Sequence, residues 1–264
     1  MKSGTLQLFS LFLLVFLFAA AVSRADGFSG RGLNEAEKLS IRQRQLLYYR
    51  DEFGDRGEKA WKKAIVSDPL NVTGSWVGSN VCNYKGVYCA PLPSNKSLIV
   101  VAGIDLNHDD IAGFLPEELG LLTDLALFHV NSNRFCGTIP HRFDRLRLLF
   151  ELDLSNNRFA GKFPDVVLRL PSLRFLDLRF NEFEGTVPSE LFDKNLDAIF
   201  INSNRFRFNI PNNIGNSPVS VIVLANNQFG GCLPASIGNM SKTLNEIILM
   251  NNGLKSCVPK EFDS

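Results

Sequence analysis

The stretch LFELDLSNNRFAGKFPDVVLRLPS (Leu149 to Ser172) is followed directly by LRFLDLRFNEFEGTVPSELFDKN (Leu173 to Asn195). Both follow one pattern, L-x-x-L-x-L-x-x-N-x-F-x-G-x-[FVI]-P, so the chain repeats itself. The same register holds from Val101 to the C-terminus. Its segments are 23 to 25 residues apart and begin at Val101, Leu125, Leu149, Leu173, Leu196, Val219 and Leu244. We expect six complete repeats and a seventh that is cut short.

The alternating part of each segment predicts a short strand. Leu152 and Leu154 point inward, while Glu151, Asp153 and Ser155 face out, because side chains alternate across a strand. A single repeat cannot bury its apolar face alone, but stacked repeats can, and their strands then form a parallel sheet on one concave side. The pattern therefore predicts an α/β fold, a leucine-rich-repeat solenoid.

Two periodic features support this prediction. An asparagine follows each strand and can bond backbone groups of adjacent repeats. A phenylalanine two residues later forms an aromatic spine, with Ile111 and Leu254 at its ends. Asp109 stands at the asparagine position of the first repeat, and we expect the ladder to end there because a carboxylate cannot donate. The asparagines are Asn133, Asn157, Asn181, Asn204 and Asn227, and the phenylalanines are Phe135, Phe159, Phe183, Phe206 and Phe229.

The G-x-I-P element, seen at Gly137 to Pro140 and Gly185 to Pro188, gives a turn of fixed geometry on the flank. This element is typical of plant-type repeats, which form a right-handed superhelix. We assign residues 101–264 to the repeats and 26–100 to a helical N-terminal cap. The cap is predicted to hold one helix from Asn34 to about Phe53 and a second from Gly57 to Val66, with Trp61 pointing inward.

Residues 1–25 are predicted to be a signal peptide, since Lys2 precedes an apolar run from Leu6 to Val22 and small residues follow it. Cleavage after Ala25 would change the net charge from +1 to about −1. A balanced charge does not favour a nucleic-acid partner. No later segment is apolar enough to span a bilayer. We therefore expect a secreted, extracellular protein.

The five cysteines lie in the secreted part, where disulfides are expected. Cys82 and Cys89 form the short cysteine loop that follows Trp76, as in the usual plant cap. Cys232 and Cys257 occupy the same place in repeats six and seven, so stacking would bring them together. Cys136 is left over. We predict a homodimer linked through Cys136, with a buried free thiol as the alternative.

Three segments resemble the leucine-rich repeat extensins of plant cell walls: RQRQLLYYRDEFGDRGE (Arg42 to Glu58), NVCNYKGVYCAP (Asn80 to Pro91) and GIDLNHDDIAGFLPEELGLLTDLALFHVNSNRFCGTIP (Gly103 to Pro140). The resemblance covers residues 33–264. It implies a cell-wall or apoplastic repeat domain that binds rapid alkalinization factor peptides, which are basic and contain cysteine. It also implies a Ser-Pro-rich extensin tail that anchors the protein in the wall. This sequence contains no such tail, no late repeats and no C-terminal cysteine cap, which puts anchoring in doubt.

The outward strand positions predict where a partner binds. Asp105, Glu151, Asp153 and Asp177 form an acidic zone that would attract a basic secreted peptide hormone. Phe175 and Phe200 lead into an aromatic and apolar zone of the kind seen at protein interfaces. The alternative is that the acids are ordinary surface charge. The predicted peptide-binding residues are Asp105, His129, Glu151, Asp153, Phe175, Asp177, Arg179, Phe200 and Val223.

The sequence also bears on metal, cofactor and catalytic sites and on alternative functions. His108 and His129 lack a defined third ligand, so we predict no metal, and we predict no cofactor. No nucleophile has a histidine and an acid at recognisable spacing, so we expect no enzyme. An inhibitor of a wall-degrading hydrolase of the polygalacturonase type and a structural wall protein are the alternative functions. Cell-wall polysaccharide and a receptor kinase are further candidate partners.

N-glycosylation sequons occur at Asn71, Asn95 and Asn239, each outside the predicted concave strands.

Overall fold

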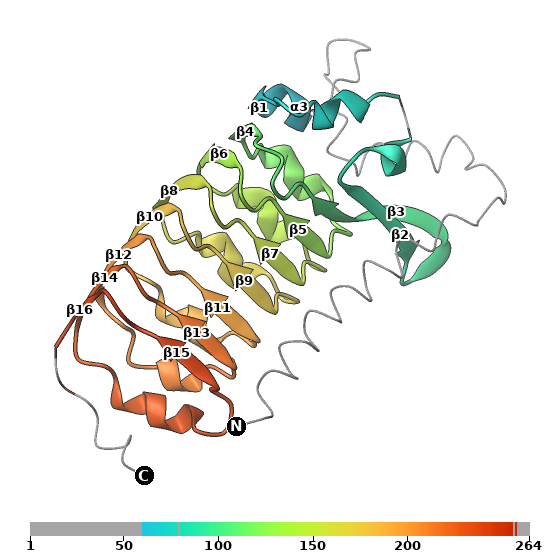
Figure 1. The fold of residues 1–264 in the computed structure, drawn as a ribbon. Coiled ribbons are helices and arrows are strands. Elements are labelled where there is room, and N and C mark those ends of the chain that lie inside the picture. The colour runs from blue at the N-terminus through green and yellow to red at the C-terminus, as the bar shows by residue number, and fades with distance from the viewer. Residues whose placement is uncertain (1–59, 79, 256, 258–264) are drawn as a thin grey trace, which may run out of the picture.

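The computed structural model describes residues 60–78, 80–255 and 257. Within this part the chain forms a curved stack of repeats with two sheets of eight strands each (Figure 1). The predicted signal peptide and the predicted cap helix from Asn34 to Phe53 lie outside the described residues. The leucine-rich-repeat solenoid is confirmed.

The concave sheet holds one strand from each repeat and, at one end, strand β2 from the cap. Its strands are parallel from β3 onward, whereas β2 and β3 pair antiparallel. Figure 1 shows them side by side, from the hairpin at one end to β15 at the other. In spatial order they are β15 (Glu246–Ile248), β13 (Val221–Val223), β11 (Ala198–Phe200), β9 (Phe175–Asp177), β7 (Glu151–Asp153), β5 (Leu127–His129), β3 (Asn95–Asp105) and β2 (Val87–Leu92).

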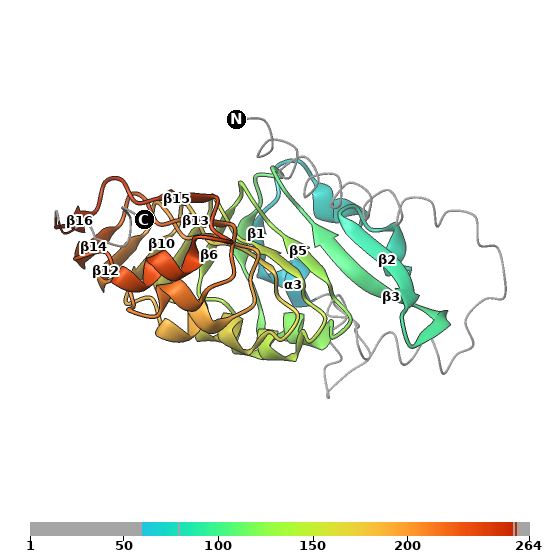
Figure 2. The same ribbon diagram turned by 90° about the horizontal axis from the view of Figure 1, so that it is seen from below.

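The second sheet runs along the flank, where the spine phenylalanines and the G-x-I-P turns lie. Short 3-10 helices close each repeat on the convex side, as Figure 2 shows from below. The flanking strands are β1 (Ile65–Ser67), β4 (Ala112–Phe114), β6 (Arg134–Gly137), β8 (Arg158–Lys162), β10 (Glu182–Gly185), β12 (Arg205–Asn209), β14 (Gln228–Gly231) and β16 (Gly253–Leu254). The 3-10 helices are η3 (Glu117–Leu121), η4 (His141–Arg145), η5 (Asp165–Arg169), η6 (Ser189–Asp193), η7 (Ile214–Asn216) and η8 (Ala235–Met240).

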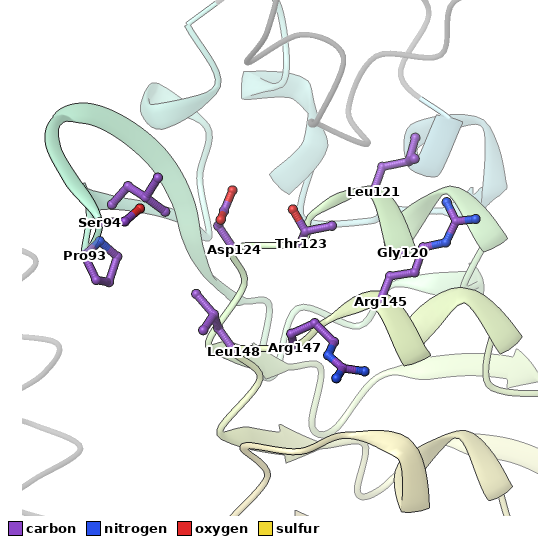
Figure 3. A pocket seen from close by; sticks show the side chains of 10 residues that line it. Pro93, Ser94, Gly120, Leu121, Thr123, Asp124, Arg145, Arg147 and Leu148 are labelled. Carbon is purple, nitrogen blue, oxygen red and sulfur yellow. The ribbon is translucent and has the colours of Figure 1, made fainter.

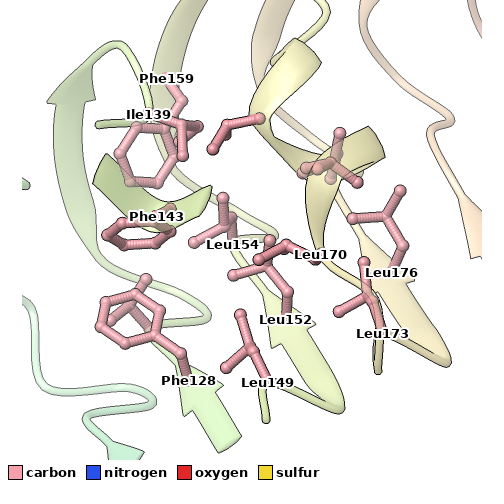
Figure 4. Packing of buried hydrophobic residues seen from close by; sticks show 14 of the residues in the cluster. Phe128, Ile139, Phe143, Leu149, Leu152, Leu154, Phe159, Leu170, Leu173 and Leu176 are labelled. Carbon is pink, nitrogen blue, oxygen red and sulfur yellow. The ribbon is translucent and has the colours of Figure 1, made fainter. Parts of the chain in front are cut away.

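The core is one continuous row of apolar side chains between the two sheets and the 3-10 helices. Figure 4 shows Leu152 between Phe128 and Phe143 of the preceding repeat on one side and Leu176 of the following repeat on the other. Stacked rings form the predicted spine, with Phe159, Phe183 and Phe206 separated by 6.5 and 6.4 Å between centroids. Each repeat therefore buries its neighbour, as expected for a solenoid.

The asparagine ladder is also present. Asn181 shows its geometry: Nδ2 donates to the carbonyl of Leu154 in the preceding repeat at 2.9 Å, and Oδ1 accepts from the backbone N–H of Phe159 at 3.0 Å. Asp109 pairs with Lys85 at 3.6 Å instead, and burial raises the pKa of its carboxyl. The ladder therefore begins at Asn133. Asn252 continues it in the seventh repeat, where its Oδ1 accepts from the backbone N–H of Phe229.

The second cap helix ends earlier than predicted. The α-helix α3 covers Ala60–Ala64, and Ile65–Ser67 form strand β1, so the prediction of a helix to Val66 is wrong. The strand pairs antiparallel with β4 opposite Gly113, where an added Cβ would lie 2.3 Å from the carbonyl oxygen of Ala64. The close approach of the two backbones thus draws these residues into the flanking sheet. Trp61 is buried, as predicted.

Candidate functional site

The outward side chains of the concave strands fall into two rows because the strands pair in register. The first row runs from Asp105 through His129, Asp153, Asp177 and Phe200 to Val223. The second row holds Glu151 and Phe175 on adjacent strands. Arg179 lies just beyond the end of β9. The structure therefore brings all nine predicted residues onto one face.

The acidic side chains of this face have partners within the chain. The Glu151 carboxylate lies 3.1 Å from His129 Nε2, an ion pair when the imidazole is protonated. Asp153 Oδ1 accepts from the backbone N–H and the hydroxyl of Ser155, at 2.9 and 2.6 Å. Asp105 Oδ1 accepts from the backbone N–H of Asn107 at 3.1 Å. Asp105 and Asp153 remain half-buried and can meet a ligand.

Asp177 differs from the prediction. It is 0% exposed, so it does not offer a free charge to a ligand. Its Oδ1 accepts from the backbone N–H of Arg179 at 3.0 Å, and Arg179 Nε lies 2.9 Å from its Oδ2. That approach is an ion pair without an aligned hydrogen bond, since neither atom has a hydrogen-bond partner. Burial, followed by the nearby charge of Asp153, raises the pKa of Asp177 to about 7.

The aromatic part of the face is centred on Phe175 and Phe200, whose ring centroids are 5.6 Å apart. The Arg179 guanidinium lies over the Phe200 ring at 5.3 Å, a cation–π contact. Both phenylalanines are half-buried, as is Val223. An apolar surface with one guanidinium therefore adjoins the acidic part.

Phe180 borders this surface and was not among the predicted residues. It is 49% exposed with φ 53°, a left-handed conformation that is costly for a bulky side chain. Repeats two, three, five, six and seven place a serine or an asparagine at this position with the same backbone, and repeat one places His108 there. The signal in the sequence was a phenylalanine in a column that otherwise holds only polar side chains.

The disulfides join Cys82 to Cys89 and Cys232 to Cys257, with Cα atoms 5.6 and 5.3 Å apart. Cys136 is free and exposed on β6, so the alternative of a buried thiol is wrong. Its outward direction follows from the alternation along β6, because the adjacent Phe135 takes the buried spine position.

The three sequon asparagines are exposed. Asn71 precedes the 3-10 helix Val72–Ser75, and Asn239 lies in η8 on the convex side. Asn95 is the first residue of β3, so placing it outside the concave strands was wrong. It lies at the turn of the β2–β3 hairpin because β3 is longer than the strand of a standard repeat. The outward rows of β5 to β15 carry no sequon.

A shallow cavity of roughly 690 Å³ lies away from the concave rows, between the turn of the β2–β3 hairpin and the 3-10 helices η3 and η4 (Figure 3). None of the predicted site residues lines it. It is lined by Leu92, Pro93, Ser94, Gly120, Leu121, Thr123, Asp124, Arg145, Arg147 and Leu148.

In residues 60–78, 80–255 and 257, no helix is both long and apolar enough to cross a membrane. Within the same ranges, no group of three or more histidine, cysteine, aspartate and glutamate side chains could hold a metal ion.

Two family models match the chain. Residues 122–183 match the leucine rich repeat, and residues 59–90 match the leucine rich repeat N-terminal domain. Both are repeat and cap families and not families of enzymes.

Curated relatives from Arabidopsis thaliana are similar to this chain. Leucine-rich repeat extensin-like protein 7 is 76% identical over 204 residues, which are 77% of this chain and 47% of that protein. Leucine-rich repeat extensin-like protein 4 is 65% identical over 66% of this chain and 40% of its own length. Leucine-rich repeat extensin-like protein 5 is 64% identical over 76% of this chain and 26% of its own length. The chain therefore spans less than half the length of these relatives.

Solved structures of similar fold are plant repeat proteins. The crystal structure of PEPR1-AtPEP1 superposes with a TM-score of 0.70 and 28% identity, covering 87% of this chain and 30% of that one. Pollen Receptor Kinase 3 gives a TM-score of 0.64 and 27% identity, over 76% of this chain and 94% of that one. The plant peptide hormone receptor RGFR1 in complex with RGF2 gives a TM-score of 0.56 and 27% identity, covering 58% of this chain and 25% of that one.

Proposed function

We propose that this chain, whose cap and repeats are similar to those of the leucine-rich repeat extensin-like relatives, is a secreted module that binds a peptide on its concave face. The peptide is basic, contains cysteine and is of the rapid alkalinization factor type. Its recognition serves cell-wall signalling and growth control. The observation that carries the proposal is the continuous row from Asp105 and Asp153 to Phe200 and Val223, in which half-buried carboxylates adjoin an aromatic surface.

Each part of that row has a separate task. Asp153 and Asp105 attract and orient cationic side chains. Phe175 and Phe200 form a rigid apolar platform for a side chain of the peptide, and such anchors dominate binding energy at protein interfaces. Similarity to a plant peptide hormone receptor supports a peptide as the ligand class. The extensin-like relatives support the cell wall as its location.

The test is calorimetric titration of the protein with a synthetic, oxidised rapid alkalinization factor peptide. Asp153→Lys places a cation where the peptide's own cations bind, so we expect affinity to fall by about tenfold or more. Asp165→Lys makes the same charge change in the same repeat, but on the exposed convex helix η5, and should bind like the wild type. Absence of binding by the wild type overturns the proposed function. Equal binding by the two variants overturns the concave site.

We further propose that Cys136 links two copies of this chain. Its thiol is exposed, and Phe114, in register with it on β4, adds an exposed ring beside it. Non-reducing electrophoresis of the secreted protein is expected to show a dimer that disappears with reductant and in Cys136→Ser. A wild-type monomer under non-reducing conditions contradicts this assignment.

A further inference from the structure

Two carboxylates with different surroundings lie side by side in the middle of the concave face. Asp153 on β7 and Asp177 on β9 are in register on adjacent parallel strands, which places them about 5 Å apart along the sheet. Asp153 is half-buried and is stabilised by the backbone N–H and hydroxyl of Ser155. Asp177 is fully buried. Only Asp153 can meet a ligand directly.

The charges around this pair come from three elements. Arg179 contributes one guanidinium beside Asp177. His129 on β5 is in register with Asp153, and it pairs with Glu151 of β7. From β11, the other strand packed against β9, the residue in register with Asp177 is the uncharged Phe200. Two carboxylates therefore share one permanent cation. The His129 imidazole pairs with Glu151, and its charge lowers the pKa of Asp177 less than that of Arg179 does.

We propose that binding of a cationic peptide side chain at Asp153 is coupled to loss of a proton from Asp177, so that this face binds basic peptides more tightly as the pH rises. The inference rests on the peptide-binding function proposed above and adds its regulation. Asp177 acts as a positioning residue, since it touches Arg179 and not the ligand.

The charge balance explains the direction. In the free protein at acidic pH, a protonated Asp177, an ionised Asp153 and the Arg179 cation sum to zero. A lysine or arginine side chain that pairs with Asp153 adds one positive charge and offsets the repulsion between the two carboxylates. Asp177 can then release its proton and become the counter-ion of Arg179, which restores the balance.

The size of the effect follows from the ionisation of the free site. Burial and the Asp153 charge raise the pKa of Asp177 to about 7, so the free site holds a proton at pH 6 and has largely lost it at pH 8. If the bound state stays ionised across this window, linkage gives an affinity about tenfold lower at pH 6 than at pH 8. Binding at pH 6 should release close to one proton.

The test is calorimetry at pH 6, 7 and 8 with a histidine-free, basic, oxidised cysteine-containing peptide, in pairs of buffers with different ionisation enthalpies. The wild type should show the tenfold change and the proton release. Asp177→Asn keeps the shape of the side chain without the titration and should bind with nearly constant affinity. His129→Gln removes the nearby imidazole, whose charge also acts on Asp177, and should keep the dependence because it leaves the carboxylate pair intact.

Each outcome has one meaning. Binding of equal strength at pH 6 and 8, or a dependence that persists in Asp177→Asn, overturns the proton coupling while leaving peptide binding in place. Loss of the dependence in His129→Gln also overturns it, because the imidazole would then carry the effect. Failure to bind at every pH overturns the proposed function instead. If Asp177→Asn does not fold, the proton count of the wild type and of His129→Gln still decides.

Discussion

Replacing Phe183 by alanine is expected to lower the free energy of unfolding by about 3–5 kcal/mol. Phe183 is only 1% exposed and stacks between Phe159 and Phe206 in the aromatic spine. The truncation leaves a cavity that the neighbouring repeats cannot fill, because their own rings are held by the same stack. Denaturant unfolding followed by circular dichroism gives the value.

Phe180→Ala is the matched control, since it removes the same ring three residues earlier. Phe180 is half exposed and its backbone is already in the left-handed region, so we expect a change within about 1 kcal/mol. An equal loss of unfolding free energy in Phe183→Ala and Phe180→Ala would contradict the aromatic spine as the main contact that stabilises the stacking of the repeats.

Replacing Asn181 by aspartate is expected to destabilise the protein by about 3 kcal/mol or more. The Asn181 Nδ2 donates to three carbonyls, those of Leu154, Leu178 and Arg179, at 2.9 to 3.2 Å. An ionised carboxylate cannot donate, so the substitution removes these bonds and buries a charge among carbonyl oxygens. The natural Asp109 shows the same limit, because it pairs with Lys85 and stands outside the ladder.

Thermal unfolding at neutral pH measures this effect. Asn156→Asp is the control, because Asn156 is exposed in a neighbouring turn and aspartate tolerates its left-handed backbone. We expect the control to melt close to the wild type. If Asn181→Asp unfolds at the same temperature as Asn156→Asp, solvent must satisfy these carbonyls. That result would contradict the structural role of the asparagines.

Much of the fold follows from the spacing of a few residue types. The alternation around Leu152 and Leu154 predicts that these two leucines are buried, because the period of a strand is two. Ser155 was predicted to face out but is buried as well. The asparagine and phenylalanine columns follow from the same register. The repeat pattern does not predict the exceptions to it. Phe208 occupies the glycine position of the G-x-I-P turn in repeat five, with φ 73° and 57% of its surface exposed.

The cap was harder to predict than the repeats. Helical spacing around Trp61 is real, but it ends at Ala64 because the next residues pair with β4, about 50 residues later in the chain. Local propensity contains no information about such a partner. The length of β3 has the same cause, since its first half pairs antiparallel with β2 and not with another repeat.

By itself, the sequence determined that Asp105, Asp153, Asp177 and Phe200 share one face, because a fixed repeat length places them on successive strands in register. Only the tertiary structure decided that Asp177 is a buried group that titrates near neutrality, whereas Asp153 remains available to a ligand. The reason is that ionisation depends on neighbours across the sheet: Asp153 comes from one repeat, Arg179 from the loop after β9, and Phe200 from the next repeat.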